Sequence, residues 1–256
     1  MEFQETIKQK KGKEKIIMLT AYDFQTAKIL DEMKIDVILV GDSLGTVFQG
    51  HSDTKSVTME DMIYHTQAVA RGVKNTPIIG DMPINSYDTA EVSLKNARRF
   101  LDAGAHGVKI EGNKPEVVKT LVRAKIPVMG HVGMLPQTAE TYKVKGKTPE
   151  EAEKILQDAI QLDACNVFSI VLECIPESLA ERITSHVRAP TIGIGAGKNC
   201  DGQVLVIYDM LGLDKDFKAK FVKRYADLNA VIKDAVAKFR DEVLTGTYPD
   251  EEHTYH

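Results

Sequence analysis

The sequence is poor in cysteine, in positive charge and in long apolar stretches, and each shortage excludes a class of protein. Its three cysteines, Cys165, Cys174 and Cys200, cannot all pair with one another, and none has the CxxC spacing of zinc or redox motifs, so we expect reduced thiols. The 37 acidic residues outnumber the 33 basic ones, which leaves no basic excess for binding nucleic acid. No stretch approaches the roughly 20 apolar residues of a membrane span, and residues 1–15 are polar and rich in lysine. We therefore expect a cytoplasmic protein whose partners are small molecules and other subunits.

The chain instead contains a regular alternation of short apolar runs and helical patterns, without an internal repeat, a low-complexity segment or a linker. Eight runs rich in β-branched residues are predicted to be strands, at residues 16–21, 37–40, 77–80, 107–110, 127–130, 168–172, 190–194 and 204–208. Helical patterns lie between most of them, at residues 25–33, 58–70, 90–103, 116–124, 149–162 and 177–185. Gly104 past a helix end, and Pro127 and Pro190 at first strand positions, suit this assignment.

This alternation predicts the fold. Near-continuous apolar strands that alternate with helices are typical of α/β proteins with a parallel sheet covered by helices. Eight such units predict a closed (β/α)8 barrel, and a chain of 256 residues fits a single barrel domain over residues 1–256. Residues 217–243 are predicted to form a helical, amphipathic tail that packs on the barrel or on a neighbouring subunit.

Polar or ionisable residues follow five of the predicted strands, at the end where barrel enzymes build their active sites. These residues are Asp42 and Ser43, Asp81, Lys109 and Glu111, His131, and Glu173. The three carboxylates of Asp42, Asp81 and Glu111 around one barrel mouth would repel one another, which would raise their pKa values. A divalent cation removes that conflict, and Mg²⁺ suits carboxylate and water oxygens while leaving positions open for a chelating substrate. Taken singly, each acid is better explained as a cap of the helix that follows it, but the three together at one barrel face favour the metal.

Glu173 has different surroundings, because it follows the apolar residues 170–172. We expect its carboxylate to be poorly solvated, which would raise its pKa toward the range useful to a general base. Proton abstraction is therefore its predicted role. The alternative is a structural ion pair with a neighbouring lysine or arginine.

Lys109 lies two residues before Glu111, so both side chains are predicted to point into the barrel. The lysine could bind a substrate carboxylate, neutralise the acids or form a Schiff base, and the last role would leave the three acids without a task. His131 could be a metal ligand, an orienting hydrogen-bond donor or an ordinary buried histidine. The preference of magnesium for oxygen favours the orienting donor.

A series of motifs gives the chain a specific resemblance. They are MLTAYD (18–23), VGDSLG (40–45), QGH (49–51), TMEDMIYHT (58–66), GDMP (80–83), VKIEG (108–112), PVMGHVG (127–133), LECIP (172–176), PTIGIGAG (190–197) and DGQVLV (201–206). In this order the chain resembles the ketopantoate hydroxymethyltransferase family from about residue 18 to residue 248.

The resemblance implies transfer of a hydroxymethyl group from 5,10-methylenetetrahydrofolate to 3-methyl-2-oxobutanoate, giving 2-dehydropantoate for pantothenate synthesis. It also implies a barrel of the phosphoenolpyruvate/pyruvate-like superfamily, one Mg²⁺ per subunit, and a homo-oligomer, a decamer of stacked pentamers. Carried over by motif, Glu173 resembles the catalytic base. The residues similar to the family's metal-site acids are Asp42, Asp81 and Glu111. The implied substrate-binding residues are Asp42, Ser43, Asp81, Lys109 and His131.

Two other functions compete with this interpretation. One is a carbon–carbon lyase of the phosphoenolpyruvate mutase and isocitrate lyase group, whose cysteine-bearing catalytic loop is not recognisable here. The other is a non-catalytic barrel that binds a keto acid or folate. A phosphate cradle at Gly193, Gly195 and Gly197 is a weaker hypothesis, because the spacing does not match GxGxxG and glycines also serve close helix packing.

Overall fold

The computed structural model describes residues 2–256, which divide into two compact units. The first unit ends at Val206 and the second spans Ile207–His256. Among residues 2–256, no helix combines the length and apolar character needed to cross a membrane.

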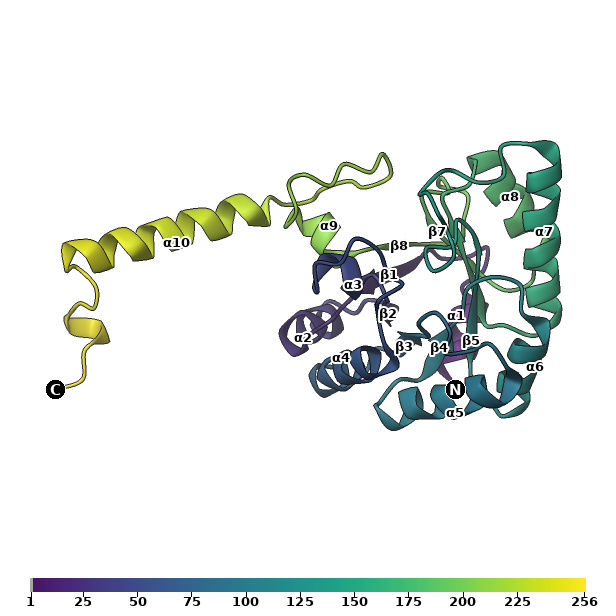
Figure 1. The fold of residues 1–256 in the computed structure, drawn as a ribbon, viewed down its shortest axis with the longest axis horizontal. Coiled ribbons are helices and arrows are strands. Elements are labelled where there is room, and N and C mark those ends of the chain that lie inside the picture. The colour runs from purple at the N-terminus through teal and green to yellow at the C-terminus, as the bar shows by residue number, and fades with distance from the viewer. Residues whose placement is uncertain (1) are drawn as a thin grey trace. The chain divides into compact units, whose positions relative to one another are not determined.

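Eight parallel strands in the first unit form a closed barrel in the order of the chain (Figure 1). They are β1 (Ile16–Thr20), β2 (Val37–Val40), β3 (Ile78–Asp81), β4 (Gly107–Lys109), β5 (Val128–Gly133), β6 (Ser169–Glu173), β7 (Thr191–Ile194) and β8 (Gly202–Leu205). Pairing of β1 with β8 closes the ring, with Ile16 opposite Gly202. The predicted (β/α)8 barrel is confirmed.

Helices surround the strands on the outside (Figure 1). They are α2 (Phe24–Glu32), α4 (Met59–Gly72), α5 (Ala90–Asp102), α6 (Pro115–Arg123), α7 (Pro149–Ala164) and α8 (Glu177–His186). Three of them begin at a threonine whose hydroxyl accepts a backbone N–H of the first turn, namely Thr58, Thr89 and Thr148. A short helix, α3 (Leu44–Val47), follows β2. The six predicted helices are therefore present, with ends that differ by a few residues.

A helix that the sequence pattern did not predict, α1 (Phe3–Gln9), contributes to the barrel core. Its Ile7 is buried and belongs to the same apolar cluster as Met18 and Phe168. Phe3 packs edge-on against Phe168, with ring centres 5.4 Å apart. Two apolar residues four positions apart in a lysine-rich segment carry too little periodicity to predict a helix.

The last strand differs from its prediction. It was expected at residues 204–208, but β8 ends at Leu205 and residues Ile207–Leu211 form helix α9. The strand begins earlier because Gly202 allows close approach to β1, where a Cβ would stand 2.5 Å from the carbonyl oxygen of Ile16. An apolar run alone does not reveal such a close approach.

The two strand prolines lie just outside their strands. Pro127 and Pro190 each precede the first strand residue, Val128 and Thr191. Their carbonyl oxygens still accept hydrogen bonds from the neighbouring chain segments, as in the 2.9 Å bond from the Val108 amide to Pro127. A residue without an N–H can thus extend the pairing only through its carbonyl.

The second unit contains α9, α10 (Leu228–Thr245) and the short 3-10 helix η1 (Glu251–His253). Helix α10 begins at Leu228 rather than at residue 217, because the side chain of Asp227 caps it by accepting the Ala230 amide. In the segment before it, the Arg224 guanidinium donates to the carbonyl oxygens of Asp214 and Phe217, which holds that segment as a loop.

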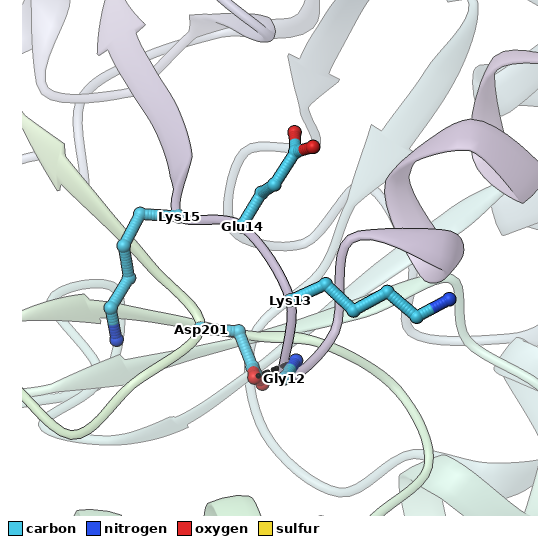
Figure 2. Close-up of a pocket in the computed structure, with 5 residues that line it drawn as sticks. All are labelled: Gly12, Lys13, Glu14, Lys15 and Asp201. Atoms are coloured by element: carbon cyan, nitrogen blue, oxygen red, sulfur yellow. Dashed lines mark hydrogen bonds between the residues drawn. The ribbon is translucent and has the colours of Figure 1, made fainter.

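At the N-terminal end of the barrel, Asp201 joins three chain segments. Its carboxylate accepts hydrogen bonds from Lys11 Nζ at 2.8 Å, the Thr191 amide at 2.9 Å and the Gly12 amide at 3.2 Å. Figure 2 shows the pocket beside it, lined by Gly12, Lys13, Glu14, Lys15 and Asp201. Both oxygens of the acid are already paired within the chain, so we assign this end of the barrel to stability.

We predict that Asp201→Asn destabilises the protein by about 2 kcal/mol at neutral pH, the scale of hydrogen bonds to a charged group. Burial alone would raise the pKa of Asp201, but Lys11 and the amides of Thr191 and Gly12 hold it below its usual range. The folded state therefore gains stability from the ionised acid above about pH 4, the unfolded value, and loses it as pH falls through the lower folded value.

Urea unfolding of both proteins across this pH range measures the effect. Glu14→Gln, an exposed acid of the same pocket, is the matched control and should change little. If the difference in unfolding free energy between wild type and Asp201→Asn does not shrink in acid, the stabilising role of ionised Asp201 is contradicted.

Candidate active site

The C-terminal ends of β2 to β6 bring six of the seven predicted site residues into one network. These residues are Asp42, Asp81, Lys109, Glu111, His131 and Glu173. The first five are buried, each with 4% or less of its surface exposed. Burial of so many charged groups requires that they pair with one another.

A buried ion pair lies at the centre of the network. Lys109 Nζ donates to both oxygens of Asp81, at 2.7 and 2.8 Å, and lies 4.0 Å from Glu111 Oε1. The pairing follows from the strand register, which sets Asp81 beside Lys109 on neighbouring strands. Burial would lower the pKa of Lys109, but Asp81, Glu111 and Asp42 raise it far above its ordinary value. The amine is therefore protonated, which disfavours the Schiff-base role.

Asp42 and Asp81 lie close together at adjacent strand ends, where the Asp42 amide donates to Asp81 Oδ2 at 3.3 Å. Burial raises the pKa of Asp42 well above its usual range, and the charges of Asp81 and Glu111 raise it further against the opposing effects of Lys109 and Gln137. Burial likewise raises the pKa of Asp81. The side chain of Asp42 pairs with Gln137, and that of Asp81 pairs with Lys109 and the Asp42 amide, so the helix-cap alternative gains no support.

His131 lies between two acids. Its Nε2 is 3.2 Å from Glu173 Oε2 and its Nδ1 is 3.5 Å from Glu111 Oε1, although neither nitrogen makes a hydrogen bond of regular geometry. Burial and Lys109 lower the pKa of His131, but the two carboxylates outweigh them and raise it to about 9. For Glu111, burial would raise the pKa, but His131 and Lys109 hold it below its ordinary range.

Glu173 is the most accessible acid of the network, since 15% of its side chain is exposed against 2% for Asp81 and Glu111. The next residue, Cys174, has φ of 47°, in the left-handed region that few side chains adopt without strain. Backbone bonds from the Cys174 amide to Ile194 and from the Lys145 amide to Cys174 hold this turn. The strand therefore ends abruptly and leaves the Glu173 carboxylate at the barrel mouth.

Ser43 follows Asp42 but has a different partner. Its hydroxyl lies 2.8 Å from the hydroxyl of Tyr22, a buried residue that follows β1. The carbonyl oxygen of Tyr22 is in turn 2.6 Å from Nδ1 of the buried His65. Tyr22 is thus the partner that orients the Ser43 hydroxyl.

Two further residues of the network, Gln137 and Tyr87, were not predicted. The amide of Gln137 contacts Asp42 and the carbonyl of Met82, and its backbone N–H donates to Glu111 Oε2 at 3.1 Å. The Tyr87 hydroxyl donates to the Gln137 side chain. Both lie in loops after strands, so strand periodicity could not reveal them; the only signal was that these loops follow strands with predicted site residues.

The glycines near β7 fit close packing better than a phosphate cradle. Gly197 has φ of 79°, and a Cβ there would stand 2.5 Å from the side chain of Glu177 at the start of α8. A Cβ at Gly193 would meet the Cys200 sulfur at 2.9 Å. An acidic side chain against this turn would repel a phosphate.

The acids fit a divalent cation only in part. Over residues 2–256, no three or more His, Cys, Asp or Glu side chains are arranged as a ready metal cluster. The donor chemistry of Asp42 and Asp81 nonetheless suits a hard cation, because both are buried oxygen donors whose mutual repulsion one lysine must offset. Glu111 Oε1 is also buried without a hydrogen-bond partner. Asp42 and Asp81 would therefore be the residues to hold such a cation, with Glu111 beside them.

Solved structures share the barrel. The chain aligns with phosphoenolpyruvate phosphomutase from Streptomyces platensis subsp. rosaceus with a TM-score of 0.64 and 14% identity, covering 99% of this chain and 91% of that one. It aligns with phosphonopyruvate hydrolase, solved with oxalate and Mg²⁺, with a TM-score of 0.67 and 11% identity, covering 99% and 93%. At such low identity these similarities show the barrel fold alone.

Sequence comparison is more specific. The chain is 50% identical to 3-methyl-2-oxobutanoate hydroxymethyltransferase from Caldicellulosiruptor saccharolyticus, over 97% of this chain and 96% of the relative. It is 51% identical to the enzyme of the same name from Clostridium novyi, over 97% and 93%. The family model for ketopantoate hydroxymethyltransferase matches residues 1–251. With that match across nearly its whole length, the chain belongs to the ketopantoate hydroxymethyltransferase family.

Proposed function

We propose that this protein transfers a hydroxymethyl group from 5,10-methylenetetrahydrofolate to 3-methyl-2-oxobutanoate, giving 2-dehydropantoate. The name of the full-length relatives supports the keto acid as substrate. The observation that carries the proposal is the row of groups at the barrel mouth, in which His131 lies between Glu111 and Glu173 beside the Lys109–Asp81 pair. This row combines an accessible base with buried positive charge, which enolate chemistry requires.

In this mechanism Glu173 removes the C3 proton of the keto acid. Its carboxylate is the accessible acid of the row, and His131 Nε2 lies 3.2 Å from Glu173 Oε2, close enough to pair with it. The C3 carbanion, delocalised as an enolate, then attacks the one-carbon carbon, and a new carbon–carbon bond replaces the lost C–H bond. Over the whole reaction both methylene–nitrogen bonds of the folate break and water supplies the hydroxyl group. The C3 proton and one proton of that water go to the two nitrogens, so tetrahydrofolate is released. Proton removal by a positioned carboxylate is the step that the geometry supports best.

Lys109 and Ser43 bind the substrate in this proposal. The protonated amine of Lys109 compensates the charge of the keto-acid carboxylate as well as that of Asp81. The hydroxyl of Ser43, oriented by Tyr22, donates a hydrogen bond to the same substrate. A Mg²⁺ ion held by Asp42 and Asp81, with Glu111 nearby, would supply positive charge for the keto oxygen.

Proton exchange at C3 tests the proposal directly. In deuterated water with Mg²⁺ and 3-methyl-2-oxobutanoate, we expect the C3 proton signal to disappear at an enzyme-dependent rate, measured by NMR. Addition of 5,10-methylenetetrahydrofolate should then yield 2-dehydropantoate. Binding of the keto acid with neither exchange nor product would reject this function in favour of a non-catalytic binding barrel, and exchange that depends on no metal would reject the magnesium.

We also propose that the chain forms a homo-oligomer. Helix α10 has no buried residue, and its apolar side chains Val231, Val236 and Phe239 are 62%, 60% and 55% exposed. Apolar surface of this kind is typical of subunit contacts. The family resemblance favours a decamer.

A further inference from the structure

One buried residue, Gln137, connects the ends of four consecutive strands. It lies after β5 and contacts Asp42 after β2, Met82 after β3 and Glu111 after β4. Its exposed surface is 0%. A residue that a loop contributes, yet that is fully buried among strand ends, has a defined local task.

Every polar group of the Gln137 side chain is used. Nε2 donates to Asp42 Oδ2 and to the Met82 carbonyl, both at 2.9 Å, and Oε1 accepts from the Tyr87 hydroxyl. Because a carbonyl oxygen can only accept, the atom facing Met82 must be the amide nitrogen. The orientation of the amide is therefore fixed, and so is the donor that it presents to Asp42.

The backbone of the same residue binds the other acid. The Gln137 N–H donates to Glu111 Oε2 at 3.1 Å, while Glu111 Oε1 has no hydrogen-bond partner. Gln137 thus occupies one oxygen of Asp42 through its side chain and one oxygen of Glu111 through its backbone. The loop after β5 thereby sets the orientation of two carboxylates on other strands.

We propose that Gln137 is a positioning residue for the reaction, whose side-chain amide holds Asp42 in the orientation needed to bind a divalent cation and the 2-oxo acid. This inference rests on the proposed function, and Gln137 itself acts only through Asp42. A partner that orients a ligand in this way commonly contributes about 10- to 100-fold in metal affinity or activity.

Three variants test it. Gln137→Met keeps the length of the side chain but removes the donors and the acceptor. Gln137→Glu keeps the shape but places a carboxylate against Asp42 and the Met82 carbonyl. Thr138→Ala, at the exposed next position of the same loop, is the matched control. For each full-length protein, Mn²⁺ affinity is measured by electron paramagnetic resonance, kcat and KM by product formation, and folding by circular dichroism and urea unfolding.

We expect Gln137→Met to weaken Mn²⁺ binding and to lower kcat by about 10- to 100-fold each, with KM for the folate unchanged. Gln137→Glu should lose more of both Mn²⁺ affinity and kcat, and Thr138→Ala should have the wild-type values of both. A role in loop anchoring alone would lower the urea midpoint of Gln137→Met but leave Mn²⁺ affinity and kcat per folded molecule unchanged, and that result would overturn the inference.

The same data separate this inference from the proposed function. A wild-type protein without turnover would contradict the function, and the ratio of Mn²⁺ affinities would still decide the role of Gln137. A wild-type protein that turns over without binding Mn²⁺ would contradict the metal site and, with it, the positioning role assigned here.

Discussion

Replacement of Glu173 by Gln is expected to lower kcat by about 10²- to 10⁴-fold, the contribution of a positioned general base. The amide cannot accept the C3 proton, yet it has nearly the same shape and can remain beside His131. Binding of 3-methyl-2-oxobutanoate should therefore persist. Initial rates of C3 exchange and of product formation, together with calorimetric binding of the keto acid, measure the two effects separately.

Glu181→Gln, an exposed acid on α8, is the control and should leave both rates unchanged. If Glu173→Gln retained full exchange activity, another group would have to be the base. Loss of binding along with exchange would instead assign Glu173 to substrate binding.

Lys109→Met should have the largest effect on stability. It removes the only cation that donates to the Asp81 carboxylate in the described network and leaves that acid buried without its partner. Breaking a buried ion pair in this way costs about 3–5 kcal/mol. Activity should fall as well, because the substrate carboxylate loses its counter-charge. Urea unfolding and steady-state rates measure both losses.

The stability of Lys109→Met should depend on pH because of the buried acids Asp42 and Asp81. Burial already raises the pKa of Asp42 and of Asp81 above their unfolded values, so their ionisation destabilises the folded state as pH rises. Without Lys109, which opposes these shifts, the pKa values rise further. The stability deficit should therefore be larger at about pH 8 than at about pH 5, where the acids can take up protons. Lys119→Met, which removes an exposed lysine paired with Glu116, should show neither effect.

The sequence alone predicts the barrel, because eight apolar runs separated by helical patterns are compatible with few other folds. It was also sufficient to place Asp81, Lys109 and His131 at one end, since the ends of parallel strands meet there. It did not reveal Gln137, whose partners are 26 to 95 positions away in the chain and whose loop has no periodicity. Contacts that depend on how a loop folds back over a barrel leave no regular pattern in the sequence.

The surroundings of Glu173 show another limit. The apolar residues before it predicted a poorly solvated carboxylate, yet part of its side chain remains exposed at the mouth. Apolar neighbours in the chain describe the strand interior, whereas exposure at the last strand position depends on the turn at Cys174. The accessible position suits proton abstraction from a substrate, but no apolar run could have predicted it.

The pairing of β1 with β8 also affects how the chain folds during its synthesis. Residues 16–19 pair with residues 202–205, so a ribosome must deliver most of the chain before β1 gains its second neighbour. Until then one side of β1 presents unpaired backbone groups, which can recruit strands of other chains. The lysines at positions 8, 10, 11, 13 and 15 lie just ahead of that edge. We expect their positive charge to oppose pairing between the open edges of neighbouring nascent chains.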